Sequence, residues 1–151
     1  MVTYYRNIIV AIDGSKEAEY AFKKSLDIAK RNAGATLYLT YIFDTRMYSA
    51  FEAYDAHAIK RTHDEINHLF ASYKAQALEA GIENIAIIVE NGLPKIDITK
   101  KVAKRVNADL IMCGATGHTK LERLLMGSVS EAIVRTAKCD VLVIRTPEIE
   151  N

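Results

Sequence analysis

The sequence has few cysteines and no excess of charge of either sign, and these shortages exclude several kinds of protein. Its two cysteines, Cys113 and Cys139, form neither a CxxC pair nor a cluster with metal-ligand spacing. We expect both to be small buried side chains, with a disulfide or a redox role as the alternative. The 20 Lys and Arg residues nearly balance the 19 Asp and Glu residues. A nucleic-acid-binding protein usually shows a basic excess or stripe, and neither is visible here.

Long apolar runs are also missing. No stretch approaches the roughly 18 apolar residues of a membrane span, and the N-terminus lacks the apolar core of a signal peptide. The sequence therefore predicts a cytoplasmic protein. The 151 residues, half of them hydrophobic, are enough for one packed domain over residues 1–151, and no repeat or linker divides them.

Short runs of branched residues alternate with helical patterns along the chain. Strands are predicted at residues 7–13, 36–43, 85–90, 109–114 and 141–145, and helices at 16–33, 59–80, around 98–106 and at 128–137. Longer loops are expected at 44–58 and 115–126, with turns at Gly14-Ser15 and Asn91-Gly92. This order predicts an α/β fold, a single doubly wound domain whose five-stranded parallel sheet has helices on both faces.

In such folds ligands bind beyond the carboxyl ends of the strands, where the winding reverses. Strands 1 and 4, or 1 and 3, commonly flank that crevice. Asp13 ends the first predicted strand, and Gly114 ends the fourth and opens the loop that leads to Gly127. Both are therefore candidate site residues.

The loop after the fourth strand combines three glycines with a helix start. Glycine lets backbone N–H groups approach an anion, and a helix N-terminus adds free N–H groups and its dipole. Hydroxyl groups of Ser128 and Ser130 can donate further hydrogen bonds, so the segment is a candidate triphosphate cradle. The alternative is structural: simple turns, followed by a capping box from Ser128 to Glu131. Neither the P-loop pattern nor the dinucleotide-binding glycine pattern occurs.

The glycine spacing itself is specific. Gly114, Gly117, Gly127 and Ser128 form a Gly-2x-Gly-9x-Gly-Ser pattern that resembles the signature of the ATP-binding branch of the universal stress protein family. The resemblance extends to the segments 8–15, 89–94, 108–112 and 141–145, and so covers nearly the whole chain. Ala11 and Asp140 depart from it, since relatives often have proline there. The resemblance implies the strand order 3-2-1-4-5 of adenine nucleotide alpha hydrolase-like proteins.

The resemblance also implies a set of nucleotide-binding residues. They are Ala11, Asp13, Ser15, Ile42, Cys113, Gly114, Gly117, His118, Gly127, Ser128, Val129 and Ser130. Asp13 would face the nucleotide and help hold the ribose or a phosphate-bound divalent cation, Mg²⁺ or Mn²⁺; alternatively it caps the helix turn with Ser15. Ile42 would form an apolar wall for adenine, and it also suits the core. His118 would be either a phosphate contact or an exposed loop side chain.

The function implied by the resemblance is a nucleotide-dependent switch or sensor in stress response. It would bind ATP, form a homodimer through the final strand at 141–145 and engage an unidentified protein partner. A slow ATPase or nucleotidyl transferase on the same site is the alternative, although Asp13 is its only evident carboxylate. A signalling receiver would need an aspartate after strand 3, where Glu90-Asn91 stands. A relative that binds no nucleotide is disfavoured by the intact glycine spacing.

Overall fold

The computed structural model describes residues 4–46, 56–116 and 126–147. In chain order the elements are β1 (Asn7–Ala11), α1 (Lys16–Arg31), β2 (Thr36–Asp44), α3 (Ala56–Glu79), β3 (Ile85–Gly92), α4 (Pro94–Asp97), the π-helical turn η1 (Ile98–Val102), α5 (Ala103–Arg105), β4 (Leu110–Gly114), α6 (Ser128–Thr136) and β5 (Asp140–Ile144). Strands and helices alternate as predicted, because apolar runs of period two and of period 3.6 follow one another in the sequence.

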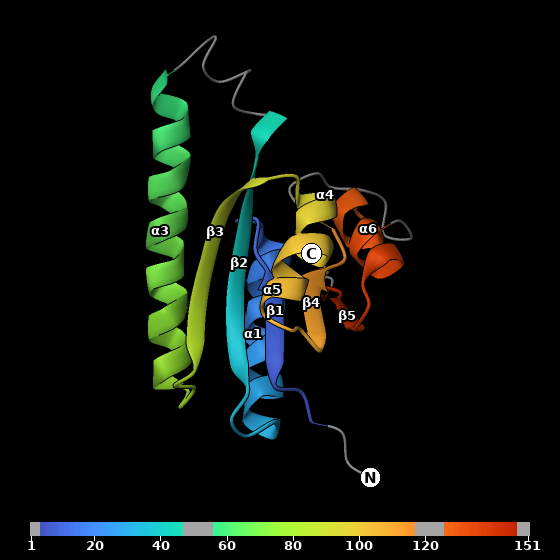
Figure 1. Cartoon of the computed structure of the whole chain (residues 1–151). Helices are drawn as coiled ribbons and strands as arrows, with labels where there is room; N and C mark the ends of the chain where they lie inside the picture. Colours follow the sequence, from blue (N-terminus) through green and yellow to red (C-terminus); the bar gives the residue numbers. More distant parts are fainter. Residues whose placement is uncertain (1–3, 47–55, 117–125, 148–151) are drawn as a thin grey trace.

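All strand pairings in the sheet are parallel, in the order β3-β2-β1-β4-β5. The predicted fold class and strand order are thereby confirmed. The winding reverses between β1 and β4, so their carboxyl ends flank the expected crevice. Figure 1 shows α4 and α6 near these strand ends, on one side of the sheet.

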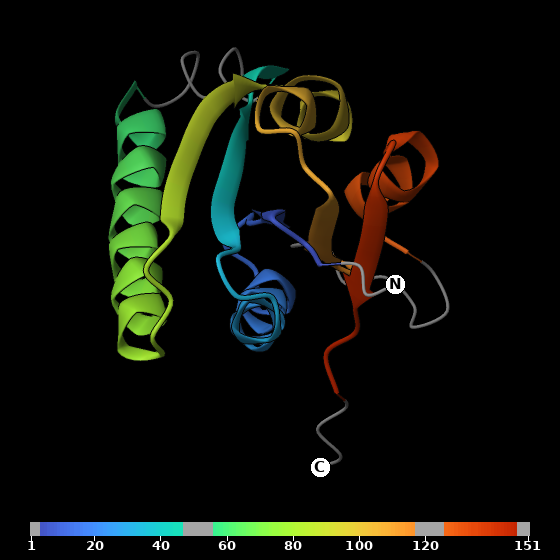
Figure 2. The same cartoon turned by 60° about the horizontal axis from the view of Figure 1, so that its bottom comes forward.

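Two cores, one on each face, hold the sheet between its helices. Ile8 and Val10 pack with residues of α1 and α3, while Ile9 lies in the core with residues of η1 and α6. All three are fully buried, which explains why β1 reads as a continuous apolar run. Figure 2 shows α1 and α6 on opposite faces of the sheet. Between the helices of the first face, the rings of Phe22 and Tyr73 stack at 4.1 Å between centroids.

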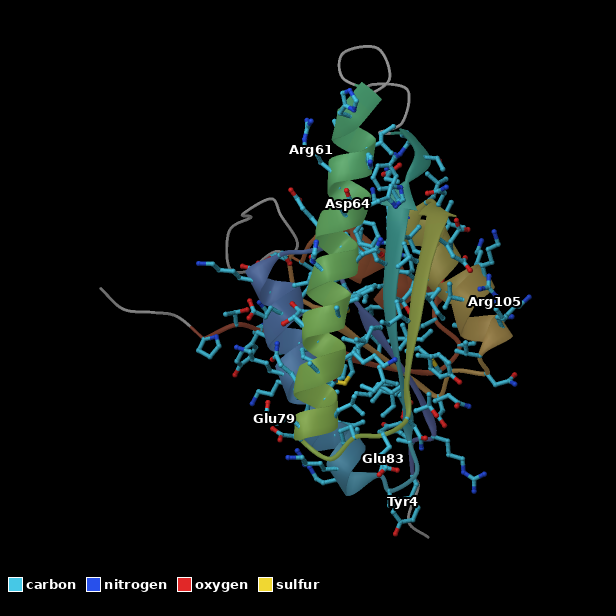
Figure 3. All side chains as sticks on the ribbon, turned by 90° about the vertical axis from the view of Figure 1, so that its left-hand side faces the viewer. Tyr4, Arg61, Asp64, Glu79, Glu83 and Arg105 are labelled. Atoms are coloured by element: carbon cyan, nitrogen blue, oxygen red, sulfur yellow. The ribbon has the colours of Figure 1, made fainter. Side chains whose placement is uncertain are left out.

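Helix α3 covers the β2–β3 side of that face. It begins three residues before the predicted start at residue 59, and its exposed side carries Arg61, Asp64 and Glu79 (Figure 3). This alternation of charge and apolar residues keeps a helix of 24 residues amphipathic. Within the described residues, no helix has an apolar stretch of the length that crossing a bilayer requires.

Some predicted boundaries were wrong. The first strand ends at Ala11, so Asp13 lies in the loop after it. Asn91-Gly92 is not a turn, because the extension of β2 to Asp44 pairs with both residues and continues β3 to Gly92. The predicted third helix is three short segments, with the π turn η1 between α4 and α5. Residues 47–55 and 117–125, which hold most of the two predicted loops, lie outside the described residues.

Candidate functional site

The loop after β1 is ordered by two side chains that were predicted to matter. The Ser15 hydroxyl caps α1 by accepting the N–H of Ala18 at 3.1 Å. Asp13 Oδ1 accepts the Ser15 N–H at 2.9 Å, across Gly14, whose φ of +84° favours glycine. The predicted structural role of Asp13 beside Ser15 is therefore confirmed.

Gly114, at the end of β4, has a packing role of its own. A β-carbon placed on it would lie 3.0 Å from the backbone carbonyl carbon of Glu17 in the first turn of α1. That distance is shorter than ordinary van der Waals contact, so only glycine lets β4 and α1 approach this closely. The glycine motif is thus required by the fold at this position, whatever it does for a ligand.

A small network of hydrogen bonds joins the end of β4 to the start of α6. The Gly127 N–H donates to the Ala115 carbonyl at 2.7 Å. The Ser130 hydroxyl, 4% exposed, lies 2.8 Å from the Ala115 carbonyl and 2.9 Å from the Gly127 carbonyl. A hydroxyl has one hydrogen, so Ser130 already donates it to the backbone. Its predicted role as a donor to phosphate competes with these bonds.

The predicted capping box at α6 was wrong. The N-cap residue is Gly127, and no side chain caps the helix there. The first intrahelical bond runs from the Glu131 N–H to the Gly127 carbonyl at 2.9 Å. The backbone N–H groups of residues 128–130 precede that bond and have no partner within the helix. They carry the positive end of the helix dipole.

The opposite wall is formed by Ile42 on β2 and by the first turn of α4. Ile42 is buried, as a core role predicted. The N–H of Leu93 donates to Asp97 Oδ2 at 2.9 Å, which fixes the start of α4 at Pro94. A β-carbon on Gly92 would lie 2.0 Å from that same oxygen. Glycine at 92 therefore allows the cap that holds this wall.

The rim beside this wall carries charged residues that the sequence analysis missed. Arg46 holds Asp44 by its backbone N–H and Nε, at 2.9 and 3.0 Å from Oδ1, and by Nη2, at 2.7 Å from Oδ2. Hydrogen bonding from Arg46 is the main reason that the pKa of Asp44 is lowered, and the charge of Lys95 on α4 adds to the effect. The spacing Asp44-x-Arg46 after a strand was the available signal.

Two further groups have raised pKa values: Tyr41, which packs in the core on the opposite face of the sheet, and Cys113, which lines the cleft. Burial, followed by the charges of Asp13 and Asp44, raises the pKa of Tyr41, so both carboxylates act on one side chain. Burial also raises the pKa of the Cys113 thiol to about 11. Cys113 is therefore a neutral, apolar part of the wall at neutral pH, and it is not disulfide-bonded.

Two hydroxyl groups join the start of η1 to the last residue of α6. The Thr136 hydroxyl donates to the Ala132 carbonyl at 2.7 Å, and the hydroxyls of Thr99 and Thr136 are 2.8 Å apart. Since Thr136 uses its hydrogen on Ala132, Thr99 is the donor of the second bond. This chain of bonds connects η1 to α6 behind the site.

These elements enclose a cleft of about 650 Å³ at the carboxyl ends of β1, β2 and β4. That volume lies within the range of small-molecule sites. Nine of the predicted residues line it: Ala11, Asp13, Ile42, Cys113, Gly114, Gly127, Ser128, Val129 and Ser130. Ser15 is buried behind the lining as the cap of α1. Gly117 and His118 lie outside the described residues.

Comparison with known proteins agrees with the fold and with the resemblance to the universal stress protein family. The family model described as the universal stress protein family matches residues 4–145. A universal stress protein of Staphylococcus haemolyticus is 49% identical over 145 residues, covering 96% of this chain and 87% of that protein.

Solved structures of the same family are similar as well. The universal stress protein UspA from Lactobacillus plantarum has a TM-score of 0.85 and 27% identity, with 95% of this chain and 100% of that chain covered. A universal stress protein in complex with cAMP has a TM-score of 0.71 and 24% identity, with 95% of this chain and 98% of that chain covered.

Proposed function

Since the chain belongs to the universal stress protein family, we propose that its cleft binds ATP and that the bound nucleotide makes the protein a switch or sensor in stress response. The observation that carries the proposal is the N-terminus of α6, which opens into a cleft of nucleotide size. The complex of a structural relative with cAMP supports an adenine nucleotide as the ligand.

The phosphates belong at the α6 end of the cleft. The free N–H groups of Ser128 and Val129 lie there, at the positive end of a helix of nine residues. Gly127 has no side chain to keep a phosphate from the backbone, and the Ala115–Ser130 bonds hold the loop and helix in place. Backbone donors fixed in advance need no reordering when the anion binds.

The base belongs against the apolar wall. Ile42, Pro94 and Ile98 line that part of the cleft. Flat aromatic bases gain from contact with such surface, and a few polar groups at the edge fix their orientation. With the phosphates and the base at these two ends, we expect the ribose near Asp13, between the two walls.

A divalent cation, Mg²⁺ or Mn²⁺, would be held mainly by the phosphates, with Asp13 as the carboxylate from the protein. Such hard cations prefer oxygen ligands and often use one or two carboxylates plus substrate phosphates. Among the described residues no group of three or more His, Cys, Asp or Glu side chains is placed to hold a metal by itself. The cation is therefore expected to bind with the nucleotide.

Calorimetric titration with ATP and Mg²⁺ tests the proposal, with ADP, cAMP and GTP titrated in parallel and released phosphate followed. We expect ATP to bind, with negligible phosphate release. Failure of all adenine nucleotides to bind would contradict the proposed function. Phosphate release at ordinary enzymatic rates would replace the switch by an ATPase on the same residues.

We also propose that the protein pairs with a second copy through β5. This strand bonds only to β4 in the described sheet, and Leu142 is 37% exposed on it. An apolar edge strand is prone to pair with another chain. Leu142→Lys should shift the protein from dimer to monomer in sedimentation, whereas Ile87→Lys on β3, at the opposite edge of the sheet, should not. A monomeric wild-type protein would contradict this.

A further inference from the structure

The rim of the cleft at the end of β2 carries the carboxylate of Asp44, which already accepts hydrogen bonds from Arg46. Asp44 follows Ile42 by two residues on the same strand, so both side chains lie on the same face of the sheet, and both line the cleft. Arg46 folds back over Asp44, and Lys95 of α4 lines the cleft nearby. Strand β1 lies between β2 and β4, the strand that leads towards α6. The ion pair is thus at the base end of the cleft.

Counting hydrogen-bond positions shows what the pair can offer a base. A carboxylate has about four lone-pair positions. Three N–H groups of Arg46 use three of them: two on Oδ1 and one on Oδ2. One acceptor position is left on Oδ2, beside guanidinium N–H groups that still have hydrogen-bonding capacity. The rim therefore presents an acceptor next to donors.

Purine bases differ in what they require from such a rim. The N1–H and N2–H groups of guanine are adjacent donors, and a carboxylate with both oxygens free accepts them as a bidentate pair. Adenine instead has an amino donor next to ring-nitrogen acceptors. An acceptor beside donors matches adenine, whereas the two free acceptors that guanine needs are blocked by Arg46.

We propose that Arg46 determines the base selectivity of the cleft by masking Asp44, so that adenine nucleotides bind more tightly than guanine nucleotides. The proposal rests on the proposed nucleotide-binding function. Arg46 masks Asp44 and places guanidinium N–H donors beside the one acceptor position that is left, and removing the guanidinium converts the rim into an acceptor for guanine.

The test is a set of dissociation constants for ATP and for GTP, both with Mg²⁺, measured by calorimetry. Wild type should prefer ATP. Arg46→Met removes the two side-chain bonds and keeps the backbone N–H on Oδ1, so each oxygen of Asp44 gains an open acceptor position. The preference for ATP should fall about tenfold, chiefly by tighter GTP binding. The double variant Arg46→Met/Asp44→Asn replaces one of the freed acceptors by an amide donor, so it should lose the gain in GTP affinity.

Lys95→Met is the matched control, since it removes a cation from the same rim and leaves Asp44 masked. Its ratio of ATP to GTP affinity should equal that of wild type. Arg46→Lys keeps the charge but lacks the planar fork, and should give an intermediate ratio. Arg46 is 68% exposed, so these variants should fold, which thermal unfolding verifies.

Three results would overturn the inference: an unchanged ratio in Arg46→Met, an equal change in Lys95→Met, or a gain in GTP affinity that persists in the double variant. An equal change in Lys95→Met would show that the loss of any rim cation alters the ratio, and a gain that persists in the double variant would show that Asp44 is not the acceptor for guanine. If wild type binds ATP and any of these occurs, only the selectivity inference fails. If wild type binds neither nucleotide, the proposed function fails as well.

Discussion

The two ends of the cleft are built by different means. At the α6 end the groups that face a ligand belong to the backbone, and Gly127, Ala115 and Ser130 are bonded to one another to hold that backbone. At the β2 end the polar groups that are proposed to face the base are the side chains of Asp44 and Arg46. Backbone groups recognise a class of anion, whereas side chains can be exchanged to distinguish one base from another. The comparison predicts that substitutions at the two ends have separable effects.

The largest effect is expected at Gly114, which belongs to the glycine motif and also packs against α1. Gly114→Val would press its side chain against the backbone of Glu17 and should reduce the free energy of unfolding by about 3 kcal/mol. Chemical denaturation without nucleotide measures this. Gly34→Ala is a suitable control because nothing lies within 4 Å of its added β-carbon, so it should show only the smaller cost of its positive φ. Equal losses would mean that close packing on α1 is unimportant.

Gly127→Val should show most clearly that the two ends of the cleft contribute separately to binding. Its φ of −64° and ψ of 156° suit any residue, so we expect the variant to fold. The added side chain stands beside the free N–H groups of α6 and should weaken ATP binding about tenfold or more, while adenosine, which has no phosphates, is affected much less. Calorimetric titration gives both affinities. If the variant folds and binds ATP as tightly as wild type, the proposed position of the phosphates at the α6 end is contradicted.

Ser130→Ala tests the support behind the same end. The change removes the hydroxyl that bonds the Ala115 and Gly127 carbonyls and should cost about 1 kcal/mol of stability. ATP affinity should fall with it, because the end of β4 and the start of α6 then keep the Gly127–Ala115 bond but lose the bonds of the Ser130 hydroxyl. Ser130→Thr keeps the hydroxyl and should recover part of both quantities. Recovery of stability without affinity would limit Ser130 to a structural role.

The smallest effect at neutral pH concerns Cys113, in the wall between the two ends. Its pKa is raised from 9.0 to about 11 by burial, so folding favours the protonated thiol. This contribution to stability is complete below the unfolded pKa and is lost as the pH rises from about 9 to about 11. The loss of stability over that interval should be smaller in Cys113→Ala than in wild type. Identical pH profiles would show that the thiol is not desolvated.

The residues that line the α6 end of the cleft were largely predictable from sequence, and those at the β2 end were not. Gly114, Gly127 and Ser128 lie close together in the chain at a fixed spacing, so one segment carried the signal. Lys95 and Asp44 come from separate elements and meet only because β2 and β3 pair as far as Asp44 and Gly92. No pattern within a short segment of the sequence predicts that these two residues lie near each other.

The fold was predicted more completely than its details. Apolar runs such as Ile8–Val10 mark buried strands wherever they pack, so the strand order and both helical layers followed. Element ends depend on tertiary partners instead. Gly127 replaced Ser128 as the cap of α6, and Asn91 became part of a strand because β2 extended to meet it.

The most direct test of the central claim is to follow the backbone amide resonances of Ser128 and Val129 by NMR during titration with ATP, and then with adenosine. We predict large shifts with ATP and small ones with adenosine, while the signals of Ile42 and Lys95 respond to both. ATP binding that leaves the amides of Ser128 and Val129 unmoved would contradict the assignment of the phosphates to the N-terminus of α6.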